Sequence, residues 1–360
     1  MIFLFLLIPL LGYAYVLWHV YRLLPLPGWL CGLASAILFC TFLCSAAIFT
    51  IDPELLDTKW MTFLYTTGTS SLIALLYAAL IFLLLDLGRL LHILPSGFLH
   101  HSWKGTLFVT SILAGLLLYG NIHYRTKVRQ PLDLTTTKEL KRPWRIVLMS
   151  DLHLGYHNQR AELARWIDKV NAERPDLVVI AGDIIDMSVL PLLEEDMAAE
   201  FRRLSAPVYA CLGNHEYYAQ DSLAVQFYQD AGIHLLRDDF AYVGSDLCIV
   251  GRDDRTNRRR QRLDRIMKPV NRERYIILLD HQPLHLEQAA NCDVDFQFSG
   301  HTHHGQVWPI SWLTEKMYEC AFGQHQRGLT RYYISSGMGI WGGKFRIGTR
   351  SEYIVATISR

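Results

Sequence analysis

Five short apolar runs between residues 146 and 298 are each followed by Asp, Asn or His side chains, and this pattern constrains the fold more than any other. Apolar runs of four or five residues, rich in Val, Ile and Leu, predict strands buried inside a sheet. In an α/β sheet, ligands bind in the crevice beyond the carboxyl ends of the strands. We therefore expect the polar residues after these runs to share one site. The runs are 146–149, 177–180, 208–212, 275–279 and 294–298.

The polar residues that follow the runs are typical ligands of divalent metals. Asp, Asn and His without Cys suit borderline-to-hard ions such as Mn, Fe, Zn or Co. One Asp-x-His pair is common by chance, whereas five clusters at five strand ends predict a metal site. The clusters are Asp151-Leu-His153, Gly182-Asp183, Gly213-Asn214-His215-Glu216, His281 and Gly300-His301-Thr302-His303.

The residue types also predict chemistry with two ions. Asp183 has two carboxylate oxygens and can bridge a pair of ions, while Asn214 adds a neutral oxygen that limits the negative charge. His301 and His303 are spaced to reach different ions. Two ions about 3.5–4 Å apart stabilise the attacking and leaving oxygens of a phosphoryl displacement and lower the pKa of a bound water. His215, next to Asn214, would then donate a proton to the leaving oxygen.

In order and spacing, these motifs resemble the calcineurin-like metallophosphoesterase superfamily from about residue 145 to 305, and more loosely from Ser336 to Arg346. The resemblance implies an α/β fold of two mixed β-sheets packed together and flanked by helices. It also implies that His215 is the catalytic histidine. One implied ion is held by Asp151, His153, Asp183 and His303, and the other by Asp183, Asn214, His281 and His301.

One segment resembles a membrane-associated bacterial branch of that superfamily. The run from Gly300 to Pro309 reads GHTHHGQVWP, where that branch has Gly-His-Thr-His-Gly-Gly-Gln. His304 replaces a glycine, the residue type that most readily adopts a positive φ. We consider two interpretations of His304, an exposed loop residue and an additional substrate contact.

The first 120 residues differ sharply in composition from the rest. They contain eight charged side chains, Arg22, Asp52, Glu54, Asp57, Lys59, Asp86, Arg89 and Lys104. About 20 mostly apolar residues are needed to span a bilayer as a helix. Four segments qualify, 2–21, 29–50, 62–85 and 105–121, and no Asp, Glu, Lys or Arg interrupts them. We therefore predict an integral membrane protein with a bundle of about four transmembrane helices over 1–121.

The remaining chain is expected to form one catalytic domain over 144–360, after a linker or lead-in strand over 122–143. Helical spacing of apolar residues predicts helices over 160–173, 192–204 and 222–231. Two further apolar runs, 331–334 and 351–358, predict strands.

The distribution of positive charge predicts how the chain is oriented. An even number of spans places the N-terminus and the catalytic domain on one side. The positive-inside rule weakly favours the cytoplasm for that side, and we expect a bacterial inner membrane. Seven scattered cysteines without a C-x-x-C pair fit a reducing compartment. The side of the catalytic domain carries Lys59, Arg125, Lys127 and Arg129, and the opposite loops carry Arg22, Arg89 and Lys104.

Several polar residues near the motifs each have two interpretations. Asp186 either orients a metal ligand or begins a helix, the second being favoured. His157 and Asn158 either contact a substrate phosphate or begin a helix. Glu216 either orients a ligand or caps the following turn. His285 and His325 are expected to be structural or at the surface.

The segment from Arg252 to Arg265 contains seven arginines. It is interpreted as a solvated basic surface, a contact with anionic lipid headgroups, or a clamp on an anionic substrate. A nucleic-acid surface is not expected, because the net charge is only +1 and aromatic residues are not interleaved with the basic ones.

These observations predict a membrane-anchored phosphohydrolase that uses two divalent ions on a phosphate ester or pyrophosphate. A lipid-linked substrate is the natural expectation, because the membrane segment keeps the enzyme beside amphipathic molecules. A resemblance to the hydrolases that cleave UDP-2,3-diacylglucosamine in lipid A synthesis gives one alternative. A non-enzymatic membrane scaffold or sensor gives another, disfavoured because none of the eight expected site residues is missing.

Overall fold

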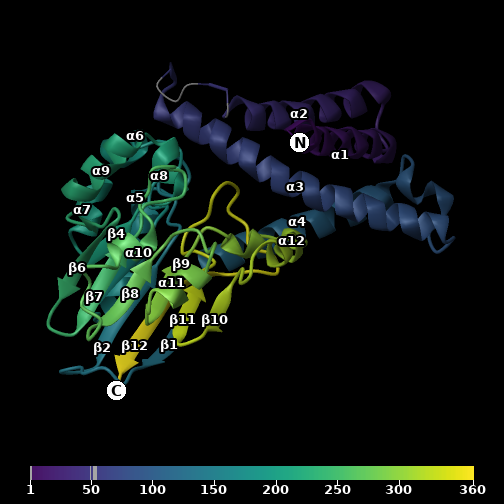
Figure 1. Cartoon of the computed structure of the whole chain (residues 1–360). Coiled ribbons are helices and arrows are strands. Elements are labelled where there is room, and N and C mark those ends of the chain that lie inside the picture. Colours follow the sequence, from purple (N-terminus) through teal and green to yellow (C-terminus); the bar gives the residue numbers. More distant parts are fainter. Residues whose placement is uncertain (1, 49, 52–54) are drawn as a thin grey trace. The chain divides into compact units, whose positions relative to one another are not determined.

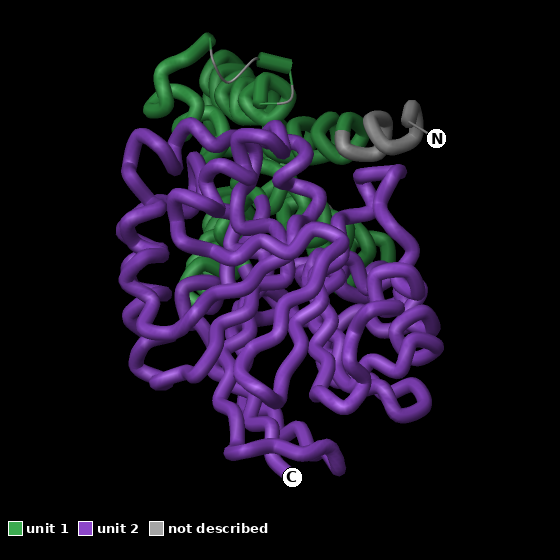
Figure 2. The backbone as a smooth tube through the Cα atoms, turned by 60° about the vertical axis from the view of Figure 1, so that its left-hand side comes forward, with its two compact units in different colours: residues 1–122, 342–345 green, residues 123–341, 346–360 purple. Residues whose placement is uncertain are grey.

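The computed structural model describes residues 2–48, 50–51 and 55–360, with the backbone alone for residues 2–9 and 96. Phe49 of the second predicted span, and two of the counted charges, Asp52 and Glu54, lie outside these residues. The described chain forms two compact units (Figure 2). One comprises the residues up to Ile122 together with Gly342–Phe345, and the other comprises His123–Trp341 and Arg346–Arg360.

The first unit contains a helix at each of the four predicted spans (Figure 1). Three of these helices, α2, α3 and α4, are long and apolar enough to cross a membrane. The third extends beyond the predicted span at both ends, and Asp57 caps its start by accepting a hydrogen bond from the Lys59 backbone N–H at 2.8 Å. The helices are α1 (Ile2–Leu23), α2 (Gly28–Ala47), α3 (Thr58–Leu90) and α4 (Trp103–Arg125).

One carboxylate, Asp86, joins α1 to α3. Its Oδ2 lies 2.8 Å from the Tyr15 hydroxyl and 2.9 Å from His19 Nε2. Its Oδ1 lies 3.3 Å from a guanidinium nitrogen of Arg89. Ionisable residues in membrane segments are costly unless they are paired, and these contacts supply the partners.

The second unit contains two six-stranded sheets, and both are mixed. This confirms the predicted fold class. The first sheet has the order β1 (Lys127–Thr135), β12 (Ser351–Ser359), β2 (Trp144–Met149), β3 (Leu177–Ala181), β4 (Val208–Cys211) and β5 (His234–Leu235). The second has the order β10 (Gly323–Arg327), β11 (Thr330–Ile334), β9 (Phe296–Ser299), β8 (Tyr275–Leu279), β7 (Leu247–Gly251) and β6 (Asp239–Val243).

Apolar side chains from both sheets form the core between them. Ile146 and Val179 of the first sheet share one buried cluster with Ile277 and Phe298 of the second. Each such side chain contributes about 1.5–3 kcal/mol when fully buried. Alternate residues of these strands point to the opposite faces, which the helices cover. The strands that lead into the motifs are therefore largely buried on both faces, which explains the continuously apolar runs 146–149, 177–180, 208–212 and 275–279, whereas β9 also buries the polar Gln297.

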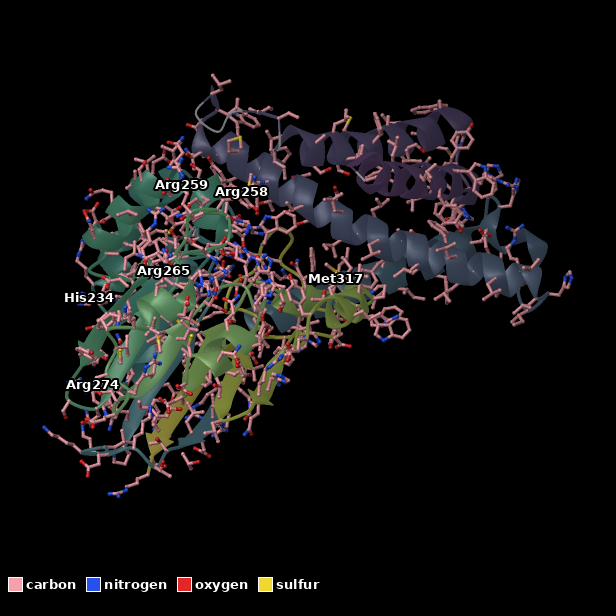
Figure 3. All side chains as sticks on the ribbon, viewed as in Figure 1. His234, Arg258, Arg259, Arg265, Arg274 and Met317 are labelled. Carbon is pink, nitrogen blue, oxygen red and sulfur yellow. The ribbon has the colours of Figure 1, made fainter. Side chains whose placement is uncertain are left out.

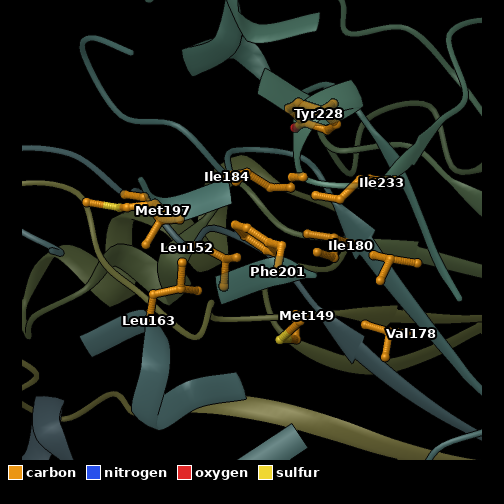
Figure 4. Packing of buried hydrophobic residues seen from close by; sticks show 14 of the residues in the cluster. Met149, Leu152, Leu163, Val178, Ile180, Ile184, Met197, Phe201, Tyr228 and Ile233 are labelled. Carbon is orange, nitrogen blue, oxygen red and sulfur yellow. The ribbon is translucent and has the colours of Figure 1, made fainter. Parts of the chain in front are cut away.

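Helices cover the outer faces of both sheets. On the first sheet, Leu163 of α5 and Phe201 of α7 pack against Val178 and Ile180 of β3 (Figure 4). That layer contains α5 (Arg160–Ala172), α6 (Leu190–Glu194), α7 (Met197–Phe201) and α9 (Asp221–Asp230). The second sheet is covered by α10 (Leu263–Ile266) and α11 (Glu287–Asn291).

One predicted helix is divided, and the lead-in segment contains a strand. Residues 192–204 do not form one helix, because Asp196 adopts a left-handed conformation with φ of 47° that separates α6 from α7. Asp is one of the few non-glycine residues that visit this region readily. Residues 127–135 form β1, an edge strand in nine-residue parallel register with β12.

Candidate metal centre

The five motifs meet because their strands end at the same edges of the two sheets. Strands β2, β3 and β4 are parallel neighbours in one sheet, and β8 and β9 are parallel neighbours in the other. Each motif begins within two residues of the end of its strand. The packing of the two sheets brings the two sets of strand ends together.

One group of side chains gathers four potential metal ligands. The Nε2 atoms of His153 and His303 lie 3.0 Å apart. His303 Nε2 is 3.5 Å from Asp151 Oδ1, and His153 Nε2 is 3.6 Å from Asp183 Oδ2. Carboxylate oxygens and ring nitrogens that converge in this way are arranged to surround a cation.

A second group shares Asp183 with the first. His281 Nε2 lies 3.0 Å from the same Asp183 Oδ2 atom. In the same group, His301 Nδ1 lies 2.8 Å from Asn214 Oδ1. One carboxylate therefore contacts ligand atoms of both groups, which is the geometry expected of a residue that bridges two ions.

The electrostatics of Asp151, His301 and His303 also fit divalent cations. Burial raises the pKa of Asp151, so its carboxylate requires a positive partner. Burial lowers the pKa of His301 to about 4 and holds the pKa of His303 well below its ordinary value. Both imidazoles are therefore neutral, which is the form that binds metal. Within the described residues, Asp151 Oδ2 and His303 Nδ1 have no hydrogen-bond partner.

His215 lies beside both groups. Its backbone N–H donates to Asp183 Oδ1 at 2.9 Å, and its Nδ1 lies 3.0 Å from Asp186 Oδ1. Burial alone would lower the pKa of His215, but the charges of Asp183 and Asp186 outweigh burial and raise it to about 9. The imidazole is therefore protonated near neutral pH in the metal-free protein, and bound cations would lower its pKa.

The family to which similar proteins belong is consistent with this arrangement of ligands. The model of the calcineurin-like phosphoesterase family matches residues 145–305. An uncharacterized metallophosphoesterase of Campylobacter jejuni is 30% identical over 269 residues, covering 69% of this chain and 68% of that protein. The chain belongs to the calcineurin-like metallophosphoesterase family. This family uses a dinuclear divalent-metal centre.

Two further relatives extend the comparison. A zebrafish (Danio rerio) protein described as a transmembrane protein with a metallophosphoesterase domain is 30% identical over 346 residues, covering 88% of this chain and 77% of that protein. An uncharacterized metallophosphoesterase of Aquifex aeolicus is 30% identical over 235 residues, covering 62% and 88% respectively. The apolar helices and the transmembrane relative together indicate a membrane protein.

Asp186 supports two histidines of the metallophosphoesterase site. It is buried in the loop before α6, so the favoured expectation of a helix start was wrong. Its Oδ1 lies 3.0 Å from His215 Nδ1 and 3.4 Å from His153 Nδ1. A carboxylate on the far nitrogen of an imidazole fixes the orientation and tautomer of the ring.

Glu216 joins two of the ligand loops. Its carboxylate accepts hydrogen bonds from the backbone N–H groups of Gly213 at 2.7 Å, Ile185 at 3.0 Å and Asp183 at 3.1 Å. The side chain is fully buried. Glu216 therefore fixes the spacing between the β3 and β4 loops, which combines the two roles considered from the sequence.

We expect Glu216→Gln to destabilise the protein and weaken metal binding. All three backbone partners are donors, so the amide nitrogen of Gln would face an N–H group without an acceptor, at a cost of about 1–3 kcal/mol. Thermal unfolding and metal titration measure the two effects. The same change at the more exposed Glu287 is the control and should have almost no effect. If Glu216→Gln unfolds at the wild-type temperature and binds metal with wild-type affinity, Glu216 does not position the ligand loops.

Gly213 and Gly300 are required for a steric reason. A Cβ atom on Gly213 would lie 2.1 Å from Asp183 Oδ1, and one on Gly300 would lie 2.2 Å from Asp151 Oδ2. The two glycines therefore allow the ligand loops to approach each other, and any side chain at either position would displace a ligand carboxylate.

Asn158 and Arg346 hold the backbone around the site. The Asn158 amide donates to the carbonyl oxygens of His153 at 2.9 Å and Ile340 at 3.2 Å, so it is not available to a substrate phosphate. Arg346 is fully buried and donates to the carbonyl of the ligand His303 at 2.6 Å and to that of Ser336. In the sequence Arg346 only marks the end of the looser family resemblance, and its supporting role depends on carbonyls of other loops.

The arginine-rich segment divides into two groups. Arg252 and Arg260 are tied to Asp280 at 3.2 and 3.3 Å and are structural. The others are exposed on the surface of the second unit, where Figure 3 labels Arg258, Arg259 and Arg265. The exposed arginines fit both a solvated basic surface and a contact with anionic lipid headgroups, and the choice between the two stays open. His285 and His325 pair with Glu287 and Glu319, and the His285 side chain is 53% exposed.

Proposed function

We propose that this chain is a membrane-anchored phosphoesterase that uses two divalent ions to hydrolyse a phosphate ester or pyrophosphate in a lipid-linked substrate. The observation that carries the proposal is the sharing of one Asp183 oxygen by two groups of ligands, with His215 beside them. Family membership supports a phosphoesterase, and the intact site disfavours the scaffold alternative.

Residues 144–360 carry the proposed catalytic domain. One ion is assigned to Asp151, His153, Asp183 and His303, and the other to Asp183, Asn214, His281 and His301. When bound, the ions would stabilise the charge on the phosphoryl oxygens and lower the pKa of the attacking water. The chain itself fixes the positions of these ligands through Glu216, Arg346 and the two glycines, so that little rearrangement accompanies metal binding.

His215 is assigned the role of general acid. A protonated imidazole can donate its Nε2 proton to the leaving oxygen while Asp186 holds Nδ1 at 3.0 Å. The contact with Asp186 stabilises the protonated form and aligns the ring. The imidazole would therefore deliver the proton in the direction that the supporting carboxylate imposes.

The membrane helices support a substrate at the membrane, since the anchored domain encounters lipids at high local concentration. The positive-inside count supports a cytoplasmic catalytic domain in a bacterial inner membrane. Hydrolysis of UDP-2,3-diacylglucosamine is one specific form of the proposal, because that molecule is a lipid-linked pyrophosphate.

The proposal is tested with the full-length protein in detergent. The metal-free protein is loaded separately with Mn, Fe, Zn or Co and assayed on bis-p-nitrophenyl phosphate, a lipid-linked pyrophosphate and UDP-2,3-diacylglucosamine. Metal-dependent cleavage of the lipid-linked pyrophosphate, faster than that of the soluble ester, is the expected result. A protein that binds two ions and cleaves none of the three substrates would contradict the proposal and favour the scaffold alternative.

A further inference from the structure

Helix α12 (Ile310–Met317) buries small polar residues and exposes large apolar ones, unlike most helices packed on a water-soluble domain. Its buried residues are polar, with Ser311 7% exposed and Thr314 8% exposed. Its exposed residues include large apolar side chains, with Trp312 at 64%, Leu313 at 60% and Met317 at 65%, together with the charged Glu315 and Lys316. A surface helix normally places its apolar stripe against the core and its polar residues in water. The sequence of α12 therefore fits an apolar surrounding on its outer side.

We call the exposed apolar residues of α12, together with Trp308 just before the helix, the α12 patch. Ile310, Leu313 and Met317 follow each other at intervals of three and four residues and so lie on one side of the helix. Figure 3 labels Met317 at the end of this helix. The α12 patch consists of Trp308, Ile310, Trp312, Leu313 and Met317, which are 41–65% exposed.

The composition of the α12 patch is typical of a membrane interface. Contiguous apolar surfaces of this kind mark sites that bind proteins or membranes. Tryptophan is enriched at the level of lipid headgroups. Lys316 is also exposed, with its ammonium 6.0 Å from the centre of the Trp312 ring. A lysine beside an inserted apolar surface can extend its charge toward anionic headgroups.

Side-chain contacts join helix α12 to the loop that carries the metal ligands His301 and His303. His304 Nε2 lies 2.8 Å from Glu315 Oε1 of α12, and the His304 ring stacks on Phe322 at 4.5 Å. His304 directly follows the ligand His303 and adopts a positive φ of 51°, as the glycine of the related motif would. Neither interpretation of His304 from the sequence is complete, because its main contact fixes α12 to the loop of His301 and His303.

We propose that the α12 patch inserts into the headgroup region of the bilayer and thereby presents the metal centre to phosphate groups at the lipid surface. A membrane is the favoured occupant because three helices of the same chain are long and apolar enough to cross a bilayer. A bilayer is therefore always available to the chain, and no second protein is needed to cover the α12 patch. The second part of the proposal, which concerns the substrate, rests on the proposed phosphoesterase function.

Insertion is tested without an activity assay. A photoreactive benzoylphenylalanine replaces Leu313 in the full-length protein, which is reconstituted into nanodiscs of phosphatidylcholine and phosphatidylglycerol. The control is the same replacement at Leu329, an apolar residue of the second unit that is 97% exposed. Irradiation should attach lipid at position 313 and little at position 329. Equal lipid attachment at both positions, or attachment of another protein or a second copy of the chain at 313, would overturn the proposal.

The consequence for catalysis is tested by charge substitution. Leu313→Glu should lower cleavage of a lipid-linked pyrophosphate in nanodiscs by about tenfold or more, since a charge replaces an inserted apolar side chain. Cleavage of soluble bis-p-nitrophenyl phosphate should stay unchanged, and Leu329→Glu should alter neither rate. Equal loss on both substrates would assign the α12 patch to folding instead of membrane contact. A wild-type protein that attaches lipid at position 313 but cleaves neither substrate would contradict the phosphoesterase function while leaving insertion intact.

Discussion

Asp183→Asn is expected to abolish hydrolysis and to weaken both metal ions at once. Asp183 Oδ2 lies 3.0 Å from His281 Nε2 in one ligand group and 3.6 Å from His153 Nε2 in the other. An amide removes the negative charge from both groups and offers only one oxygen. Loss of a residue that merely supports a ligand costs about 10–100-fold in metal affinity, so the loss of the shared ligand should cost more.

The measurement is metal content by mass spectrometry, together with turnover of bis-p-nitrophenyl phosphate. Asp239→Asn is a suitable control, because Asp239 is exposed and its contact with the Phe240 backbone N–H survives in an amide. Loss of a single ion, with the other bound at wild-type affinity, would show that Asp183 does not bridge. The assignment of Asp183 to both groups would then have to be withdrawn.

His215→Ala should reduce turnover by about 10²–10⁴-fold, the usual contribution of a positioned proton donor, while two ions remain bound. The reduction should be larger for an alkyl phosphodiester than for bis-p-nitrophenyl phosphate, because p-nitrophenolate leaves without needing a proton. The wild-type rate should fall as the pH rises through the pKa of His215, since only the protonated imidazole can donate. The rate of the His215→Ala variant should not show this fall at high pH.

A matched control is His285→Ala, which removes an exposed imidazole outside the site. One competing role for His215 is specific, because Asp186, His153 and His215 also form a group close enough to hold an ion. Loss of a metal ion from His215→Ala would identify His215 as a ligand. An unchanged dependence on the leaving group would argue that it does not protonate the leaving oxygen.

The proposed membrane contact of α12 and the metal centre are linked through specific contacts in the second unit. The loop that carries His301 and His303 continues into His304, which is fixed to α12 by Glu315. Transfer of the exposed Trp312 and Leu313 side chains from water to an apolar environment is energetically favourable. The polarity of α12 thus offers a physical reason for a phosphoesterase to remain at a bilayer.

The sequence by itself determined the strands and the types of ligand. Buried strands such as 275–279 are recognisable because both of their faces must be apolar, and the polar residue that follows marks the strand end. The long apolar segments were equally clear, because a spanning helix requires about 20 apolar residues. These signals are local, so they survive without knowledge of the fold. The single helix predicted over 192–204 failed because one left-handed residue, Asp196, interrupted it.

Only the tertiary structure decided which atoms meet. The roles of Asp186 and Glu216 depend on contacts with residues up to 33 positions away, and the contact between Arg346 and His303 spans 43 positions. No local periodicity encodes such distances, because they follow from the order of strands and the packing of two sheets. The exposure of α12 was also invisible in sequence, since an apolar stripe normally indicates a buried face. The physical reason is the same in each case: composition sets what a residue can bind, whereas the fold sets what lies within its reach.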